Sequence, residues 1–395
     1  MKFYKLTPDT DRIKRELERI GVDSYALKMA DKGTALNILA RDVKPPAANI
    51  IKQEAIASGM DAAVKRGTVS CSIEKTDVLL MGSPAAFKRL IKRLRLQVFG
   101  LKELADDLDL FLKNREAGYI SAGDKKISLD KTLVMGILNV TPDSFSDGGK
   151  YYTDKDAGNH IDRMVSEGAD IIDIGGMSSR PGSCGIESSQ EIKRIKFAVE
   201  YAVERGVIVS VDTNNYETAE YALNKGVHII NDISGMRDVN MIKVCADAKC
   251  AVCIMHMRGE PLNMQYDTVY DNIIYDIYDF FGERTEACLN AGLDCSNLIL
   301  DVGFGFGKSV RQNYALLKYM REYKSFNLPL LAGISNKSMI GVATFREVED
   351  RAAGTSAANA AAIMNGADII RVHDVKAGVD TARTVDMMMK AGAEC

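Results

Sequence analysis

The sequence predicts an α/β protein in which a small N-terminal α/β domain precedes a (β/α)8 TIM barrel. Eight apolar runs of about five to eight residues recur between Thr132 and Val375, and segments with a helical pattern separate them. The runs are apolar throughout rather than alternating, which is typical of parallel strands that helices cover on both faces. A continuous series of eight such units over roughly 265 residues favours a closed barrel over an open doubly wound sheet, which usually has fewer strands.

Residues 1–115 are predicted to form the small α/β domain, whose role the sequence leaves open. A cluster of five basic residues between Lys88 and Arg95 is compatible with phosphate or nucleic-acid binding. Because these residues alternate with leucine and isoleucine at helical spacing, the exposed face of an amphipathic helix explains them better. Helices are expected through Glu18, across Ala47–Lys65 and from Ser83 through Leu96, and strands at Ala35–Ala40 and Thr76–Met81.

The segment 116–131 is predicted to hold a linker and a β-hairpin, because two short apolar pieces flank the turn sequence AGDK at 122–125. The barrel is expected over residues 132–395. Its strands are expected at TLVMGILNV, DIIDIGG, VIVSVDT, VHIINDIS, CAVCIMH, NLILDVG, LPLLAGIS and DIIRVHDV. Between them lie helical patterns such as AGNHIDRMVSEGA, EIKRIKFAVEYAVERG, YETAEYALNKG and NYALLKYMREY.

The composition is typical of a soluble globular protein, with 46% hydrophobic and 27% charged residues in a chain of 395. A net charge of −3 provides no overall basic field that attracts nucleic acid. No apolar run approaches the roughly 18 residues that a membrane-spanning helix needs. The first residues are charged and lack the apolar middle of a signal peptide, so a cytoplasmic protein is expected.

Eight cysteines are scattered along the chain without a repeating spacing, and they are predicted to be reduced thiols. Cys250 and Cys253 form a CxxC motif inside an apolar run, with no second pair nearby. Buried strand residues are therefore predicted there in preference to a zinc or redox site. The four histidines are too dispersed to suggest a metal cage.

Polar residues follow the apolar runs, at the strand ends where barrels of this kind carry their active sites. Carboxylates at Asp212 and Asp301, with the amide of Asn231, are suited to the hydrogen-bonding edge of a flat heterocycle, because a carboxylate accepts two parallel N–H bonds. Structural ion pairs with lysine or arginine are the alternative for each carboxylate. The polar strand-end residues are Asn139, Asp173, Asp212, Asn231, Asp232, His256, Asp301, Ser335, Arg371 and His373.

Positive charges and oxygen ligands suggest a second, anionic ligand group. Arg371 and His373 lie two residues apart on one strand and are expected to address one phosphate together, with Arg180 and Lys337 as further cations. Asn139 and Asp143 offer oxygens to Mg2+, which takes further ligands from substrate phosphates. A pyrophosphate group is therefore plausible.

The segment GFGFGKS does not match a P-loop, because that motif requires glycine where this chain has Val302. Its glycines are predicted to permit a tight turn beside the flat ligand.

Residues 130–395 closely resemble the dihydropteroate synthase family, through an ordered series of motifs. The motifs are GILNVTPDSFSDGG, DIGGMSSRPG, SVDT, INDISG, MHMRGEP, LDVGFGFGK, GISNKSMIG and RVHDV. The resemblance implies a pterin-binding barrel that condenses 6-hydroxymethyl-7,8-dihydropterin pyrophosphate with 4-aminobenzoate, in the presence of Mg2+. It also implies sulfonamide inhibition and a homodimer. Charge and hydropathy, as described above, predict no nucleic-acid or membrane partner.

The resemblance further implies roles for individual residues. Asp212, Asn231, Asp301 and Lys337 would hold the pterin, and Asn139 would ligate Mg2+ and, with Arg371 and His373, hold the pyrophosphate. Phe145, Ser179, Arg180 and Pro181 would shape the aminobenzoate pocket, and Ser338 would meet the aminobenzoate carboxylate at a helix start. Lys337, Arg180 and Asn139 are the residues for which it implies catalytic roles.

Three positions depart from the family pattern. Asn336 replaces the usual arginine, Ser179 replaces threonine, and Val302 replaces proline. Asn336 is the most consequential, because an amide cannot supply the planar cation of arginine. Two alternatives stay open. A pterin-binding barrel that transfers a methyl group to a corrinoid shares the pterin-reading aspartate and asparagine positions, and Asn336 motivates a pterin-binding protein without synthase activity.

Overall fold

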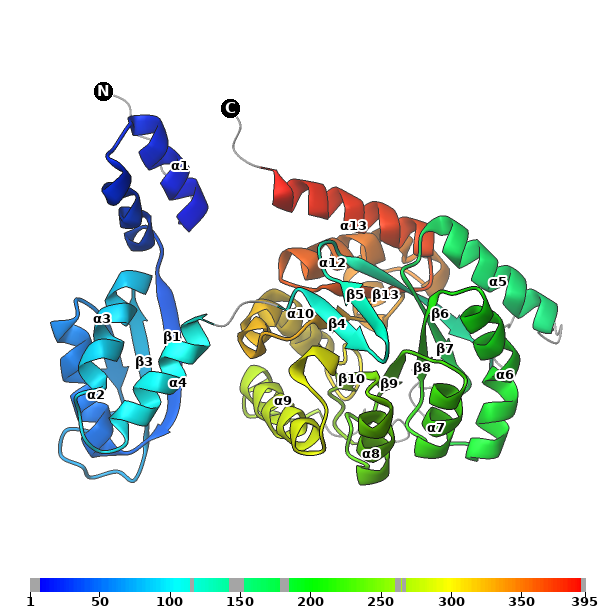
Figure 1. The fold of residues 1–395 in the computed structure, drawn as a ribbon, viewed down its shortest axis with the longest axis horizontal. Coiled ribbons are helices and arrows are strands. Elements are labelled where there is room, and N and C mark those ends of the chain that lie inside the picture. Colours follow the sequence, from blue (N-terminus) through cyan, green and yellow to red (C-terminus); the bar gives the residue numbers. More distant parts are fainter. Residues whose placement is uncertain are drawn as a thin grey trace. The chain divides into compact units, whose positions relative to one another are not determined.

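A computed structural model describes residues 8–113, 117–141, 153–177, 185–259, 264 and 268–391 (Figure 1). The chain divides between residues 113 and 117 into two compact units. The hairpin at 117–128 belongs to the second unit, together with the barrel.

The first unit is a small α/β domain built on a three-stranded antiparallel sheet of order β1-β3-β2. Helices α2, α3 and α4 contribute its core together with the inward-facing residues of the sheet. The elements are α1 (Thr10–Ile20), η1 (Ser24–Lys32), β1 (Leu36–Val43), α2 (Pro45–Ala57), β2 (Asp61–Val64), β3 (Thr76–Gly82), α3 (Pro84–Leu94) and α4 (Leu101–Lys113).

The prediction of one helix across Ala47–Lys65 is wrong in its second half. Helix α2 ends at Ala57, and Gly59 turns the chain with a φ of +74°, a conformation that ends helices. The chain then forms the short strand β2, which pairs with β3. Neither α4 nor η1 was predicted.

The basic cluster of the first unit lies on an amphipathic helix, as predicted. In α3 the side chains of Phe87, Leu90 and Leu94 are buried in the core. The basic side chains pair within the unit: Lys88 Nζ lies 3.0 Å from Asp31, and Arg95 contacts Asp106 and Asp109, each at 2.7 Å. Arg93 contacts Glu54, and Arg89 donates to a backbone carbonyl. The cluster is therefore largely neutralised by the unit's own acceptors.

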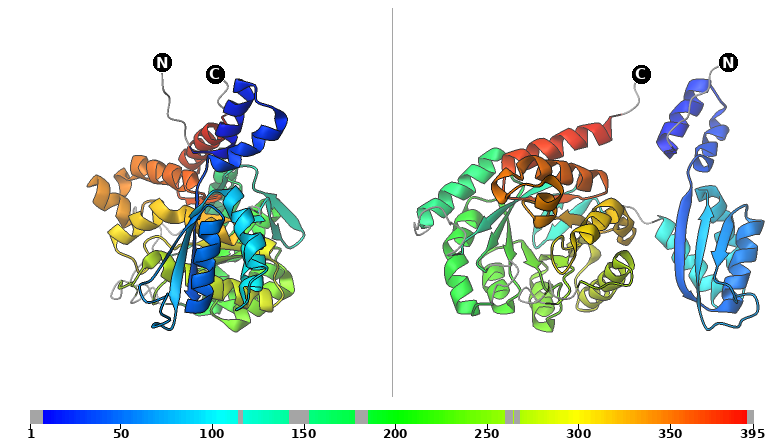
Figure 2. Two further views of the ribbon diagram at one scale, coloured as in Figure 1. Left: turned by 90° about the vertical axis from the view of Figure 1, so that its left-hand side faces the viewer. Right: turned by 180° about the vertical axis from the view of Figure 1, so that it is seen from behind.

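The second unit confirms the predicted barrel. Eight parallel strands close in the order β10-β11-β12-β13-β6-β7-β8-β9, and helices surround them (Figure 2). The strands are β6 (Leu133–Asn139), β7 (Ile171–Gly175), β8 (Ile208–Asp212), β9 (Ile229–Asp232), β10 (Ala251–Met255), β11 (Leu298–Asp301), β12 (Leu330–Ala332) and β13 (Ile369–Val372).

The surrounding helices come from the segments between the strands and after the last one. They are α5 (Asp154–Glu167), α6 (Ser188–Glu204), α7 (Tyr216–Asn224), α8 (Val239–Ala248), α9 (Ile273–Asn290), α10 (Val310–Tyr319), α11 (Ser338–Thr344), α12 (Ala352–Met364) and α13 (Val375–Lys390). Short 3-10 helices lie at Cys295–Asn297, Met320–Phe326 and Val348–Asp350. The helices bury one large apolar layer against the outward-facing strand residues.

A β-hairpin closes the amino-terminal end of the barrel. It consists of β4 (Tyr119–Ala122) and β5 (Lys125–Ser128), and its apolar side chains pack against the first inward-facing residues of the barrel strands. Gly123 N donates to Lys249 O at 2.9 Å, and Asn297 Nδ2 donates to Ser121 O at 2.8 Å. The hairpin leaves the opposite end of the barrel as the place for a ligand.

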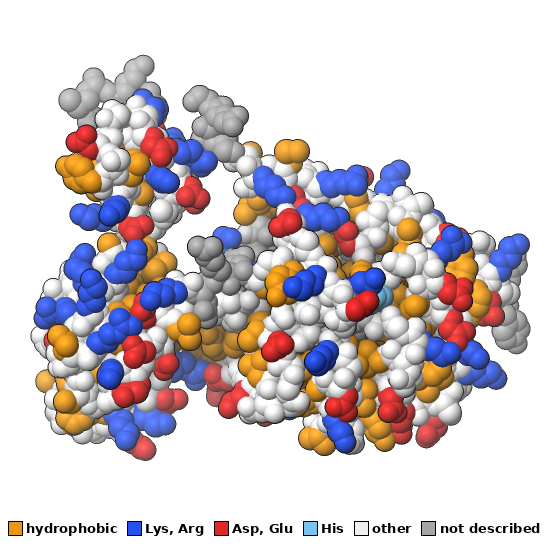
Figure 3. Space-filling model, viewed as in Figure 1, with side chains coloured by type: hydrophobic (Ala, Val, Ile, Leu, Met, Phe, Trp, Pro, Cys, Tyr) orange, Lys and Arg blue, Asp and Glu red, His pale blue; other side chains and the backbone are white. Residues whose placement is uncertain are grey.

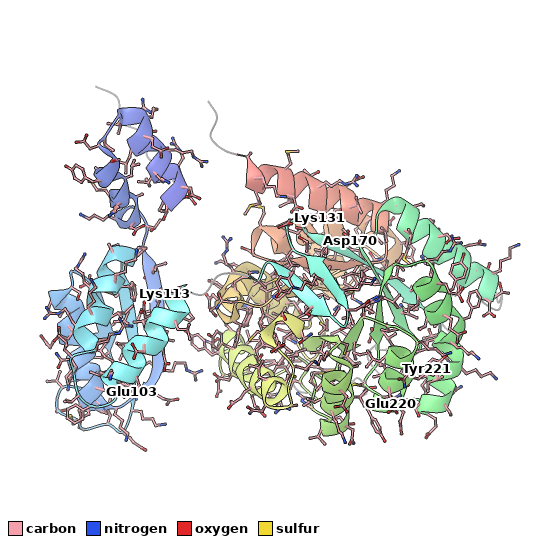
Figure 4. The ribbon with its side chains drawn as sticks, in the orientation of Figure 1. Glu103, Lys113, Lys131, Asp170, Glu220 and Tyr221 are labelled. Carbon is pink, nitrogen blue, oxygen red and sulfur yellow. The ribbon has the colours of Figure 1, made fainter. Side chains whose placement is uncertain are left out.

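Ion pairs also join the strand starts at the closed end. Lys131 pairs with Asp170 at 2.5 Å between the starts of β6 and β7, and both residues are labelled in Figure 4. Lys324 pairs with Asp368 at 2.9 Å before β12 and β13. Both carboxylates also accept a backbone N–H of the neighbouring strand, so each ion pair joins two adjacent strands at this end.

Two bulk expectations concern the surface. Within the described part of the chain, no helix has the length and apolar character needed to cross a bilayer. Figure 3 shows positively and negatively charged side chains interspersed over the face turned to the viewer, in keeping with a net charge near zero.

Candidate active site

Four polar residues converge inside the barrel, toward the carboxyl ends of the strands. Arg371 of β13 donates from Nε to Asp173 of β7 at 2.6 Å and from Nη2 to Asp212 of β8 at 2.8 Å. Asn231 of β9 donates from Nδ2 to Asp173 at 3.2 Å. Each of them faces inward because side chains alternate along a strand. Closure of the barrel therefore joins residues up to 198 positions apart in one buried network.

Burial governs the charges of this network. Burial raises the pKa of Asp212 to about 7, although the cation of Arg371 opposes that shift. Burial alone would lower the pKa of Arg371, but Asp173 and Asp212 outweigh it and hold the guanidinium pKa above its usual value. Arg371 is thus fixed as a cation beside a carboxylate whose proton is exchangeable near neutral pH.

Asp301 and Lys337 form a second group next to the first. A Cβ built at Gly333 would lie 3.9 Å from Asp301 Oδ2 and 3.9 Å from Lys337 Nζ, which places both groups around one small space. Gly303 N donates to Asp301 Oδ1 at 2.8 Å, and Lys337 Nζ donates to Phe304 O. The ammonium also lies 4.6 Å from the ring centroid of Phe306. Burial lowers the pKa of Lys337 to about 8, and Asp301 opposes that shift.

The GFGFGKS segment forms a turn that lies against these groups. Gly303, Gly305 and Gly307 have φ angles of +66°, +82° and +63°. Lys308 Nζ is buried and donates to the carbonyls of His256, Gly303 and Phe306 at 3.0, 2.9 and 2.9 Å. The lysine therefore binds the turn's own backbone instead of a phosphate, which agrees with the rejection of a P-loop.

Replacing glycines of this turn should separate folding from function. In Gly303→Ala the new Cβ would lie 2.0 Å from His256 O, so we expect a loss of stability of about 3 kcal/mol or more. In Gly305→Ala the φ of +82° also strains the new side chain, but the nearest atom is Lys337 Cδ at 3.3 Å, on a side chain that can shift. We therefore expect a smaller loss of stability, about 1 kcal/mol, together with a loss of activity as Lys337 moves. Thermal unfolding and steady-state kinetics of both variants test this. Equal unfolding temperatures for the two would contradict it.

The remaining predicted residues lie around the mouth or outside the described part. Asn139 is half-buried at the end of β6, with its Oδ1 over Gly175 and near Asp212. His373 is exposed, and its Nδ1 lies 3.0 Å from Ser335 Oγ. Ser338 is exposed and is the first residue of α11. Asp143, Phe145, Ser179, Arg180 and Pro181 fall outside the described residues.

Asn336 has a structural role in the loop that carries Lys337. Its φ of +58° lies in the left-handed region, which asparagine tolerates better than most residues. The side-chain Oδ1 accepts from Thr355 Oγ1 at 3.3 Å, and the backbone carbonyl accepts from Arg351 Nη1 at 2.9 Å. The amide therefore ties the loop to α12 instead of supplying a group to the heterocycle.

The two cysteines of the CxxC motif are buried, as predicted, whereas Cys71 and Cys295 are exposed. Cys250 and Cys253 are buried thiols, Cys253 on the inner face of β10. No group of three or more histidine, cysteine or acidic side chains suited to a metal occurs among the described residues.

Known proteins match the barrel that carries this site. The family model described as "Pterin binding enzyme" matches residues 135–373. The dihydropteroate synthase of Escherichia coli K12 is 42% identical over 266 residues, which cover 67% of this chain and 94% of that protein. This chain belongs to the dihydropteroate synthase family. The barrel is accordingly a transferase of this family, and the methyltransferase alternative falls away.

Two further relatives extend the comparison. A crystal structure of Yersinia pestis dihydropteroate synthase with a sulfonamide drug complex has a TM-score of 0.67 at 42% identity and covers 69% of this chain and all of that one. The bifunctional dihydropteroate synthase/dihydropteroate reductase of Helicobacter pylori is 34% identical over 385 residues, which cover 96% of this chain and 97% of that protein. The second relative therefore includes the N-terminal unit as well as the barrel.

Sequence reasoning missed the way in which these residues pair. It grouped Arg371 with His373 as an anion site, whereas the guanidinium contacts the carboxylates of Asp173 and Asp212. It also assigned no role to Asp173. A signal was present, since an aspartate in the middle of an apolar strand requires a buried partner of opposite charge.

Proposed function

We propose that the barrel condenses 6-hydroxymethyl-7,8-dihydropterin pyrophosphate with 4-aminobenzoate, giving 7,8-dihydropteroate and pyrophosphate. The observation that carries this proposal is the convergence of the buried residues Asp212, Asn231 and Asp301 with the half-buried Lys337 in a chain of this family. Carboxylates and an amide in a buried site suit the N–H donors of a pterin. The synthase structure from Thermus thermophilus, 34% identical to this chain, was solved in complex with 4-aminobenzoate.

Two pairs of residues would bind two neighbouring edges of the pterin ring. Asp212 and Asn231 lie on adjacent strands and would address one edge of the ring, with Arg371 behind the carboxylate. Asp301 and Lys337 would address the neighbouring edge from the β11 and β12 ends. As an ammonium group, Lys337 would donate hydrogen bonds to acceptor atoms on that edge of the pterin.

A Mg2+ ion fits the pyrophosphate end of the site. The Asn139 side chain makes no hydrogen bond within the described residues, and its amide oxygen is a hard ligand of the kind Mg2+ accepts. In the described part there is no acidic cage, so most ligands would be substrate oxygens and water. A bound Mg2+ would neutralise charge on the departing pyrophosphate. His373 and Ser335 lie at the same end of the strands.

The reaction requires no nucleophilic side chain. The bond between the pterin methylene carbon and the pyrophosphate oxygen breaks, and its electron pair leaves with pyrophosphate. The electron-rich pterin, held by the buried carboxylates, stabilises the cationic methylene carbon. The aminobenzoate nitrogen then forms the new C–N bond and releases a proton to water. By family resemblance, Ser338 would hold the aminobenzoate together with Phe145, Ser179, Arg180 and Pro181, which lie outside the described residues.

The pKa shifts predict a narrow bell-shaped pH dependence. Asp212 must be ionised to accept two N–H groups, so kcat/KM for the pterin substrate should fall about tenfold per pH unit below about pH 7. Lys337 must be protonated, so kcat/KM should also fall above about pH 8. Initial rates from about pH 5.5 to about pH 9.5 measure both limbs. In Lys337→Arg, a cation at every pH, the alkaline limb should disappear; a flat wild-type profile would contradict the assignment.

Pyrophosphate release decides the synthase proposal. Purified full-length protein should release pyrophosphate only when the pterin pyrophosphate, 4-aminobenzoate and Mg2+ are all present, and a sulfonamide should compete with 4-aminobenzoate. Pterin binding without turnover would instead support the non-catalytic alternative. Removal of Mg2+ by EDTA, followed by its return, tests the proposed metal.

One relative points to a second activity. The protein named for both synthase and reductase matches both units, whereas the E. coli synthase matches a share of this chain about the size of the barrel. Two archaeal relatives named for folylpolyglutamate synthase and dihydropteroate synthase match as much of this chain without the reductase name. We propose that the N-terminal unit adds a dihydropteroate reductase function. A hydride would add to C6 of dihydropteroate and a proton to N5, while a nicotinamide or flavin donor is oxidised.

The reductase proposal has its own test. Full-length protein should oxidise NADPH, with or without added flavin, in the presence of dihydropteroate. The barrel alone, residues 117–395, is the control, because solved relatives consist of a chain of that extent. Equal rates with and without the N-terminal unit, or no oxidation at all, would reject the assignment.

A homodimer and a cytoplasmic location are also proposed. Helices α12 and α13 border a groove lined by small and polar residues, and Met364, Met387 and Met388 near it are exposed. Exposed methionines beside small residues suit contact with a second copy. Light scattering of the purified chain tests the dimer, and fractionation of the source cells tests the location.

A further inference from the structure

Asp173 is the member of the buried network that cannot meet a ligand directly. Its side chain is fully buried in the middle of β7. One oxygen, Oδ2, accepts both from Arg371 of β13 and from Asn231 of β9. These two strands lie two places away from β7 on either side in the barrel order. The carboxylate thus reaches across the interior in both directions.

The surroundings of Asp173 contain no other partner for it in the described chain. Its Oδ1 is buried without a hydrogen bond, and so is the Oγ of Ser210, its register partner on β8. A half-satisfied buried carboxylate costs free energy, and native proteins retain few such groups without a reason. The reason must lie in the two side chains that Asp173 holds.

The geometry of Arg371 shows what Asp173 determines. With Nε on Asp173 and Nη2 on Asp212, the planar guanidinium is fixed in one orientation by two carboxylates. Its Nη1 makes no hydrogen bond within the described residues and stays available for a ligand. Loss of Asp173 would release one edge of this plane and the amide of Asn231 at the same time.

We propose that Asp173 is a positioning residue of the synthase site. It holds Arg371 against Asp212, and it holds the Asn231 amide toward the heterocycle, without touching substrate. The proposal rests on the synthase function proposed above and extends it to a residue below the pterin. Asp173 therefore acts on pterin binding alone, because Arg371, Asn231 and Asp212 all lie on that side of the site.

The test uses Asp173→Asn in the full-length protein, which keeps the side-chain shape and removes the charge. We expect KM for the pterin substrate to rise about 30-fold and KM for 4-aminobenzoate to stay within about twofold. Asp368→Asn is the matched control: it removes a carboxylate from an ion pair and a backbone hydrogen bond at the closed end of the barrel. That variant should lose stability and keep both KM values.

A double variant distinguishes positioning from a general effect on the fold. Because Asp173 acts through Arg371 and Asn231, Asp173→Asn combined with Arg371→Lys should raise the pterin KM by less than the product of the two single effects. Additive effects, an equal rise in both KM values, or unchanged KM values with reduced stability would each overturn the proposal. If Asp173→Asn does not fold, Asp173→Ser serves the same comparison. Failure of the wild-type protein to release pyrophosphate would instead concern the synthase function.

Discussion

Replacing Asp212 with asparagine is expected to lower kcat/KM for the pterin substrate by about 10³-fold, while the protein stays folded. Asparagine keeps the shape but offers one acceptor oxygen and no charge, so it cannot accept two parallel N–H groups from the ring. Loss of a charge-assisted pair, with polar groups left unmatched in a buried site, accounts for about 4 kcal/mol. Steady-state kinetics with each substrate varied in turn, and calorimetric titration of the pterin, measure the effect.

The raised pKa of Asp212 determines how the contribution of this side chain to stability depends on pH. The unperturbed carboxyl value is 3.8 and the folded value is about 7, so the folded state favours the protonated form. The contribution of this group to stability is therefore present below about pH 4 and is lost as the pH rises through 7. At about pH 8 we expect the unfolding temperature of the variant to fall by no more than about 3 °C. Asp162→Asn is the control, because Asp162 is a half-buried carboxylate that pairs with Arg205 away from the site.

A large loss of stability is expected when Arg371 is replaced by methionine. The variant leaves Asp173 and Asp212 buried without the cation that both contact. Removal of one partner from a buried ion pair costs about 3–5 kcal/mol, because the remaining charge stays desolvated. Synthase activity should fall below detection, since the same guanidinium supports the pterin side of the site.

Two controls make the Arg371→Met result specific. The loss of stability should be greatest at high pH and partly recover on acidification, because two uncompensated buried carboxylates favour their protonated forms. Adding Asp173→Asn to Arg371→Met should also restore part of the stability by removing one buried charge. Urea denaturation at about pH 6 and about pH 8 measures both. A loss that is independent of pH and unaffected by the second substitution would contradict the account.

Much of the fold was predictable because local pattern reflects burial. Each of the eight apolar runs became a barrel strand, since strands buried on both faces carry no polar alternation. The glycine-rich turn was also predictable in kind, as its three glycines adopt positive φ angles. The fold of the first unit was less predictable. A short edge strand such as β2 follows a helix after only three residues, and propensity does not separate the two.

The sequence by itself determined the barrel, the strand-end positions of Asp212, Asn231 and Asp301, and, through its ordered motifs, the family. These properties follow from patterns within about ten residues of the chain, which govern burial and side-chain alternation. Only the tertiary structure decided that Arg371 pairs with Asp173 and Asp212, that Lys308 binds its own turn, and that Asn336 ties its loop to α12. These contacts join strands and loops far apart in the chain, so they depend on the register in which the strands of the closed barrel pair.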